Sequence, residues 1–126
     1  QIQISVRSSI ESAKEALIQK VETVTELCGG KTVVSSEYPG WAYRKDSPLR
    51  DTIIRVYREM YGKEPEIQAI HAGLECGILA EKIEDLDCVS LGPDMKNIHT
   101  TEETLSISSA KRVWEFCLAV LKQKSK

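Results

Sequence analysis

The chain has 126 residues and a mass of 14.1 kDa, enough for one small domain or two incomplete ones, since domains usually contain about 100 to 200 residues. Hydrophobic residues make up 41% and charged residues 29% of the sequence, which excludes a mainly disordered chain. Seventeen Lys and Arg against 19 Asp and Glu give a net charge of -2 without a basic block, so the composition lacks the footprint of a nucleic-acid-binding protein.

The sequence contains no apolar run near the roughly 18 residues that a membrane span requires. Residues 1–9 alternate polar and apolar positions and do not form a signal peptide. We therefore expect a cytoplasmic protein without a membrane partner. The chain starts at Gln1, without Met and inside a strand-like pattern, which indicates a fragment of a longer protein.

The four cysteines lie far apart, without the C-x-x-C spacing of a zinc knuckle and without the pattern of a disulfide framework. Free cysteines are among the most buried residues of proteins. We therefore expect reduced core thiols at Cys28, Cys76, Cys88 and Cys117.

The first part of the chain is predicted to contain a strand, a helix and a second strand. Alternating apolar and polar residues predict a half-buried strand over residues 1–6. Ser8 and Glu11 have the spacing of a capping box, and apolar residues then recur at helical spacing. The glycine pair at 29–30 is expected to end this helix in a left-handed conformation.

A second strand is predicted over residues 32–36, and Tyr38-Pro39-Gly40-Trp41 then supplies turn chemistry. We place a domain boundary after residue 43. Residues 1–43 form only a β-α-β unit, near the limit of about 40 residues below which chains rarely fold unassisted. Upstream sequence is therefore expected to supply partner strands.

Residues 44–126 are predicted to form an α-β-α-β-α arrangement, the alternation of a layered α/β fold. The predicted elements are a helix from Ser47 to Gly62, a strand over 66–70, a helix over 74–83, a strand over 87–91 and, after a long loop, a helix from Ser106 with Ala110, Val113, Trp114, Cys117 and Leu121 facing inward.

Two places combine residues that could carry chemistry. His71 to Gly77 puts an imidazole and a carboxylate at a strand-to-helix turn, where the helix N-terminus favours an anion. The alternative is structural, with Gly73 as a turn residue and Glu75 as a partner of the helix dipole. His99 lies in the long loop, where Glu103 could orient it as a metal ligand; the alternative is a solvated loop histidine.

These residues do not complete a metal site by themselves, because catalytic zinc generally takes three protein ligands. The motifs do, however, occur in the order of a known family. In order, they are Ser5-Val6-Arg7, Tyr38-Pro39-Gly40-Trp41, His71-Ala72-Gly73-Leu74-Glu75-Cys76-Gly77, Val89-Ser90-Leu91-Gly92-Pro93, and His99 with Glu103.

With these motifs the chain resembles the C-terminal part of the aminoacyl-histidine dipeptidases, also called Xaa-His dipeptidases or bacterial carnosinase-like enzymes. They are dinuclear zinc exopeptidases, a group of hydrolases. The resemblance covers essentially the whole chain. It implies that residues 1–43 are the C-terminal β-α-β half of a ferredoxin-like lid domain and that residues 44–126 are the C-terminal portion of the catalytic domain.

The resemblance also implies roles for individual residues. Arg7 matches an arginine that reaches the substrate carboxylate, and Gly73 and Glu75 match the turn of the substrate pocket, where Glu75 would receive the free amino group of the dipeptide. His99 matches a histidine that ligates one of two zinc ions, and Glu103 matches the acidic residue that supports it. The family usually has His-Ser-Pro-Asp-Glu where this chain has residues 99–103, HTTEE.

The resemblance implies hydrolysis of Xaa-His dipeptides of the carnosine type by the full-length protein. The family's His-x-Asp motif, its metal-bridging Asp and its Glu-Glu pair with the general base are not in this chain, so the fragment is predicted to be inactive and to contain no catalytic residue. Its exposed strand edges predict self-association. The alternatives are a non-catalytic α/β association module and another hydrolase of the same clan; the sequence HAGLECG argues against the latter.

Overall fold

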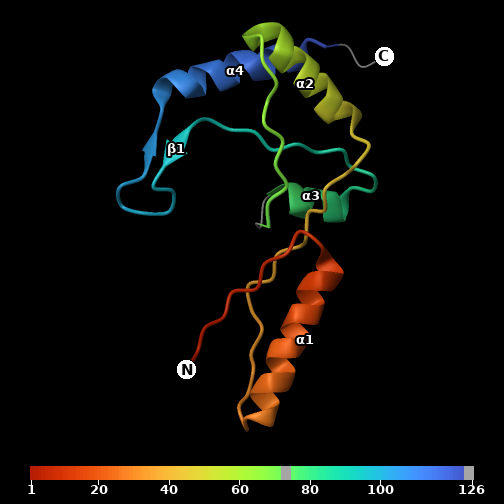
Figure 1. The fold of residues 1–126 in the computed structure, drawn as a ribbon, viewed down its shortest axis with the longest axis vertical. Helices are drawn as coiled ribbons and strands as arrows, with labels where there is room; N and C mark the ends of the chain where they lie inside the picture. The colour runs from red at the N-terminus through yellow and green to blue at the C-terminus, as the bar shows by residue number, and fades with distance from the viewer. Residues whose placement is uncertain (72–74, 124–126) are drawn as a thin grey trace. The chain divides into compact units, whose positions relative to one another are not determined.

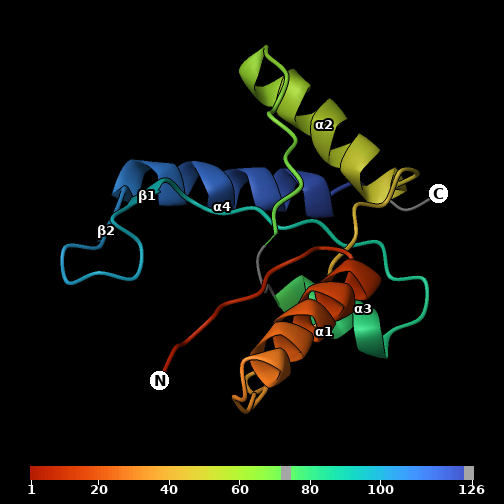
Figure 2. The ribbon, with the colours of Figure 1, turned by 60° about the horizontal axis from the view of Figure 1, so that its bottom comes forward.

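The computed structural model describes residues 1–71 and 75–123 of the chain. The chain divides into two compact units, each of which combines two stretches of sequence. Unit 1 consists of residues 1–45 and 67–87, and unit 2 consists of residues 46–66 and 88–126. The elements labelled in Figures 1 and 2 are, in chain order, α1 (Glu11–Leu27), α2 (Pro48–Tyr61), α3 (Glu75–Lys82), β1 (Met95–Lys96), β2 (Thr104–Leu105) and α4 (Ile107–Leu121).

Helix α1 of unit 1 ends as the glycine pair predicts. Gly29 has a left-handed φ of +73°, and its N–H donates to the carbonyl of Glu26 at 2.9 Å. The N–H of Gly30 donates to the carbonyl of Thr25 at 2.8 Å. Together these bonds form a Schellman motif, which satisfies carbonyl groups at the helix C-terminus that have no partner within the helix.

The beginning of α1 differs from the predicted capping box. The N-cap residue is Ile10, and its side chain makes no capping hydrogen bond to the first turn of the helix. The Ser8 hydroxyl accepts from the N–H of Ile10 at 3.1 Å and not from the first turn of the helix. The capping box does not form because the Glu11 carboxylate bonds Lys14 and Gly40 and does not reach back to the N-cap.

Helix α3 confirms the predicted helix from Glu75 onward, and its last residue is Lys82. The predicted start at Leu74 lies outside the described residues. Gly77 is buried, and a Cβ there would come within 3.0 Å of the Pro39 carbonyl oxygen. Gly77 therefore lets α3 pack closely against the turn at residues 38–41.

Unit 2 has a small core between α2 and α4. The bounds of α2 confirm the sequence prediction, because the Ser47 hydroxyl accepts from the N–H of Arg50 at 3.0 Å and Gly62 ends the helix with a φ of +68°. The ring of Tyr57 meets that of Phe116 edge-on, with centroids 5.5 Å apart. The buried core residues are Ile53, Val56 and Phe116, with Leu49, Tyr57, Tyr61, Val89, Ala119 and Val120 packed against them.

Helix α4 packs with a different face from the predicted one. Phe116 is 6% exposed, whereas Trp114 is 65% exposed and Leu121 is also exposed. The prediction that Trp114 and Leu121 face inward is therefore wrong. Because α4 is apolar on several sides, its periodicity does not determine which side is buried; packing against α2 does, and it selects the side of Phe116.

The structure also contains a hairpin that the sequence did not predict. Strands β1 and β2 pair in an antiparallel ladder, with Met95 opposite Leu105 and Lys96 opposite Thr104. The hairpin leads directly into α4, whose N-cap Ser106 accepts from the N–H of Ser109 at 3.3 Å (Figure 2). The long loop expected between residue 91 and α4 is therefore partly ordered as a two-stranded ladder.

The four strands predicted over residues 1–6, 32–36, 66–70 and 87–91 do not form in the described part of the chain, where β1 and β2 are the strands present. Residues 1–9 instead follow an elongated path up to the start of α1 (Figures 1 and 2). A strand needs a neighbouring strand to bond its N–H and C=O groups. Alternation of side chains predicts an extended segment but does not supply that neighbour.

The cysteines are free thiols, but they are less buried than expected. Cys28 is exposed because it is the C-cap of α1, and the other three are half-buried. No helix among residues 1–71 and 75–123 is long and apolar enough to cross a membrane.

Candidate functional site

In unit 1, a hydrogen bond joins the two segments that carry the predicted substrate-binding residues. The Nδ1 atom of His71 accepts from the main-chain N–H of Ser9 at 3.0 Å, across 62 residues of sequence. Ser9 follows Arg7 by two residues, and Glu75 follows His71 by four. The structure therefore connects the Arg7 segment to the segment that leads into α3.

The predicted substrate-binding side chains are accessible. Arg7 is exposed, and no hydrogen bond or ion pair to its guanidinium is found within the described ranges. Glu75 is exposed as the first residue of α3, where the helix dipole favours its carboxylate. Gly73 lies outside the described residues. A free guanidinium can form a bidentate pair with a carboxylate, and a free carboxylate can accept from an ammonium group.

A second cluster in unit 1, formed by Glu11, Lys14, Tyr38 and Gly40, was not predicted. Lys14 is only 8% exposed; its Nζ donates to the Tyr38 carbonyl and pairs with Glu11 Oε1, both at 2.5 Å. Glu11 Oε2 accepts from the N–H of Gly40 at 2.7 Å. These bonds fasten the turn at residues 38–41 to the first turns of α1, and we call the four residues the turn clamp.

The turn clamp lowers the pKa of the Glu11 carboxyl. The hydrogen bond from Lys14 and then that from Gly40 hold the pKa of the Glu11 carboxyl below its ordinary value of 4.5. Two features of the sequence hint at the clamp: Lys14 lies one turn after Glu11, and residues 38–41 form an unusual run. Neither hint identifies the partner, because Tyr38 and Gly40 contribute main-chain atoms.

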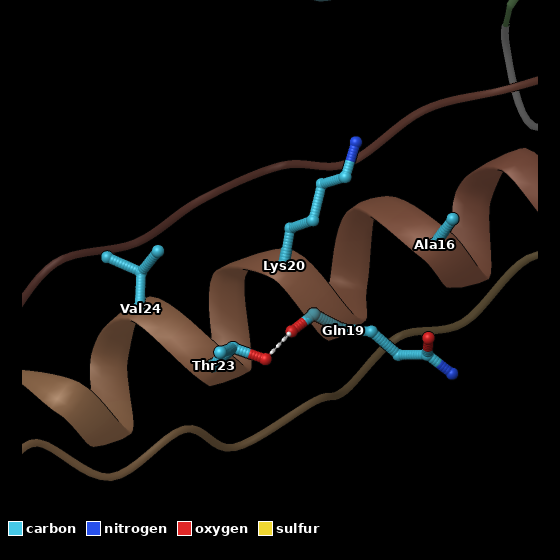
Figure 3. A pocket seen from close by; sticks show the side chains of 5 residues that line it. All are labelled: Ala16, Gln19, Lys20, Thr23 and Val24. Atoms are coloured by element: carbon cyan, nitrogen blue, oxygen red, sulfur yellow. Dashed lines mark hydrogen bonds between the residues drawn. The ribbon is translucent and has the colours of Figure 1, made fainter.

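Two open hollows lie beside α1, and neither contains a predicted site residue. The larger, about 570 Å³, borders the turn clamp and is lined by Glu11, Lys14, Glu15, Glu37, Tyr38, Pro39, Gly40, Ala80 and Glu81. The smaller, about 390 Å³, is a shallow surface along α1 lined by the five residues labelled in Figure 3. The polar contact drawn there joins the Thr23 hydroxyl to the Gln19 carbonyl within α1.

In unit 2, His99 lies between β1 and β2. Its backbone is left-handed, with a φ of +66°, and its main-chain N–H donates to Glu103 Oε2 at 2.8 Å. Glu103 therefore holds the loop backbone and does not contact the imidazole through this bond. Asn97 contributes to the same loop, because its carbonyl accepts from the Thr100 hydroxyl at 2.7 Å. His99 is exposed and presented by a hydrogen-bonded turn.

The donor set for a metal ion is incomplete. Among residues 1–71 and 75–123, no group of three or more His, Cys, Asp or Glu side chains could hold a metal. Catalytic zinc generally takes three protein ligands. The described part of this chain therefore does not fit a zinc site by itself, and His99 can supply at most one ligand to a site completed by other residues.

Comparison with known proteins identifies similar enzymes. No family model matches the chain. It is 33% identical over 123 residues to the cytosol non-specific dipeptidase of Escherichia coli K12, a match that covers 98% of this chain and 25% of that protein.

A solved structure agrees with the sequence match. The crystal structure of aminoacylhistidine dipeptidase from Vibrio alginolyticus matches with a TM-score of 0.76 and 34% identity, over 94% of this chain and 24% of that one. The chain thus spans about a quarter of the length of the relatives that it matches. The resemblance to the aminoacyl-histidine dipeptidases, inferred from the sequence motifs, is therefore confirmed over nearly the whole of this chain.

Proposed function

We propose that this chain is the C-terminal portion of a cytoplasmic dipeptidase, a hydrolase that cleaves Xaa-His dipeptides of the carnosine type. The observation that carries the proposal is the match of 98% of the chain to one dipeptidase, together with the structural match to a second. Both relatives are dipeptidases by name. The name of the second specifies an aminoacyl-histidine substrate, and the name of the first specifies the cytosol.

In this proposal the two exposed charges of unit 1 bind the ends of the dipeptide. Arg7 pairs with the substrate carboxylate, and Glu75 receives its free amino group. Support comes from the exposure of both side chains and from the absence of a partner for the Arg7 guanidinium among the described residues. Gly73 would let the backbone approach the substrate closely, because glycine has no Cβ.

His99 would contribute one imidazole ligand to a dinuclear zinc site, with Glu103 fixing the loop that presents it. The other ligands and the general base would come from the part of the dipeptidase that this chain does not contain. The zinc ions held by His99 and those other ligands would supply the activation of a water molecule and the polarisation of the scissile carbonyl. Since this chain offers one ligand, we propose that it is inactive by itself.

We also propose a division of the chain into parts of two domains. Residues 1–43 would be the C-terminal half of a ferredoxin-like lid, and residues 44–126 would be the C-terminal portion of the catalytic domain. The absence of a strand ladder over residues 1–6 and 32–36 supports this division, because both segments would find neighbouring strands in a complete lid. The same unpaired segments would let the isolated chain associate with itself.

The test is hydrolysis by a protein of dipeptidase length that ends in this sequence. Purified with zinc, it should release histidine from a β-alanyl-histidine substrate, and a chelator should abolish the release. The 126-residue chain, assayed identically, is the matched control and should release none. A full-length protein that folds and binds zinc but hydrolyses no dipeptide would contradict the proposal and favour a non-catalytic association module.

A further inference from the structure

His71 has a specific hydrogen-bonding geometry that the proposed roles of Arg7 and Glu75 do not require. Its Nδ1 atom is the acceptor of the 3.0 Å bond from the Ser9 N–H. An imidazole nitrogen accepts a hydrogen bond only when it carries no proton. The bond therefore requires the His71 tautomer that carries its proton on Nε2.

The His71 partner, Ser9, lies in the stretch of main chain just before α1, residues 8–10, which we call the corner. Other contacts also hold this corner. Ser8 bonds the N–H of Ile10 on one side of Ser9. A Cβ on Gly40 would come within 2.9 Å of the Ser9 carbonyl oxygen, so the turn at residues 38–41 packs against the same corner. The main chain at Ser9 is thus confined, and its bond to His71 adds the link to residues 67–71.

Arg7 depends on this corner for its position. Residues 1–6 have no strand ladder among the described residues, so the backbone before Arg7 lacks the hydrogen bonds that would fix a strand. After Arg7, the Ser8 hydroxyl bonds only the nearby N–H of Ile10, whereas Ser9 carries a bond to a segment far away in the sequence. A guanidinium must be held in place to pair with a carboxylate in bidentate geometry, and the His71 bond constrains the backbone two residues away.

We propose that His71 is a positioning residue, which holds the backbone next to Arg7 through the Ser9 N–H and thereby orients the guanidinium for the substrate carboxylate. The proposal rests on the proposed function of Arg7. It adds that His71, which does not itself contact the substrate, controls the affinity for the dipeptide through its hydrogen bond with Ser9.

The hydrogen bond itself is tested in the 126-residue chain, independently of any enzymatic activity. In a 15N-labelled sample, a through-bond coupling between the Ser9 amide nitrogen and His71 Nδ1 should be detected at a pH where His71 is neutral. The coupling should disappear in His71→Gln, and the Ser9 amide should then exchange faster with solvent. The proposal would be overturned if the wild-type chain showed no such coupling and the Ser9 amide exchanged at the same rate in the wild type and in His71→Gln.

The consequence for affinity is tested in the dipeptidase-length protein with three substitutions. Asparagine places a carbonyl oxygen where histidine has Nδ1, whereas the acceptor of glutamine lies one bond further out and alanine has none. His71→Ala and His71→Gln should raise KM for the dipeptide by about 3- to 10-fold, the range for one hydrogen bond, with a smaller effect on kcat. His71→Asn should restore KM, and Ser9→Ala, which keeps the main-chain donor, is the matched control.

A double-mutant cycle separates positioning of Arg7 from general damage. If His71 acts through Arg7, then adding His71→Gln to an Arg7→Ala enzyme should change KM little further, because coupled effects are not additive. Fully additive effects, or a KM that His71→Gln leaves unchanged in an active enzyme, would overturn the positioning role. Failure of the proposed function is distinguishable, since the wild-type protein would then hydrolyse no dipeptide while the coupling in the 126-residue chain persisted.

Discussion

The main-chain N–H of His99 donates a 2.8 Å hydrogen bond to the carboxylate of Glu103. This bond closes the turn between β1 and β2 and holds His99 in a left-handed conformation with a φ of +66°. Left-handed residues other than glycine are uncommon, although His, Asn and Asp are enriched among them. Glu103 therefore acts on the backbone that presents the imidazole, which differs from the direct support of the imidazole expected from the sequence.

This geometry makes a prediction for Glu103 that separates charge from hydrogen bonding. Glutamine keeps an oxygen that can accept from the His99 N–H, whereas alanine does not. In the dipeptidase-length protein, Glu103→Ala should weaken zinc binding on the order of 10-fold, the lower end for loss of a group that orients a ligand, and Glu103→Gln should weaken it less. Zinc competition against a chelator measures both. Equal losses in the two variants would show that the charge matters and the turn does not.

The turn clamp predicts a pH-dependent contribution to stability. The lowered pKa of Glu11 means that its ionised form stabilises the folded chain at pH values above 4.5, the ordinary value. That stabilisation should disappear as the pH falls through the lower pKa of the folded state. Urea unfolding of wild-type and Glu11→Gln chains between pH 3 and 7 checks this: the wild type should be more stable at neutral pH, and the difference should shrink in acid. A difference that is constant over this range would contradict the clamp.

The packing of α4 predicts opposite outcomes for two neighbouring aromatic residues. Phe116→Ala should lower the free energy of unfolding of unit 2 by about 3 to 5 kcal/mol, because it leaves a cavity beside Tyr57. Trp114→Ala, the matched control on the exposed side, should change it by no more than about 0.5 kcal/mol. Denaturant unfolding followed by circular dichroism compares them. A larger loss for Trp114→Ala would mean that α4 packs with the face first expected from the sequence.

Exposed apolar residues on segments without a strand ladder predict self-association of the 126-residue chain. Ile2 is 87% and Val33 is 81% exposed, and extended segments with unpaired backbone groups recruit other chains. Sedimentation velocity should show a sedimentation coefficient that rises with concentration. The double variant Ile2→Lys with Val33→Lys should lower it, and Gln3→Lys is a control on the same segment. A wild-type chain that is monomeric at all concentrations would contradict this prediction.

The helices were predictable because their signals are local. Ser47 and Gly62 delimit α2, and the glycine pair after Cys28 ends α1, as short-range capping chemistry requires. The hairpin was not predictable, because each of its strands has two residues, too few for an alternating pattern. The buried side of α4 depends on α2, a tertiary partner that periodicity does not reveal.

In the candidate site, too, the features with a local sequence motif could be predicted and those that depend on tertiary contacts could not. Motif order indicated Arg7, Glu75, His99 and Glu103 from the sequence, and the match to two dipeptidases supports the family on which those assignments depend. The bond from Ser9 to His71 and the bond from Lys14 to the Tyr38 carbonyl could not be predicted. They join residues far apart in sequence through main-chain atoms, which carry no sequence signal.

The most direct test of the central claim is the zinc content and Xaa-His hydrolysis of a His99→Ala variant of the dipeptidase-length protein. The wild-type protein should hold two zinc ions, as a dinuclear hydrolase does. His99→Ala should lose one of them and most of the turnover, while its far-ultraviolet circular dichroism stays that of the wild type. A His99→Ala enzyme with the full zinc content and near-normal turnover would contradict the account and leave His99 an ordinary loop histidine.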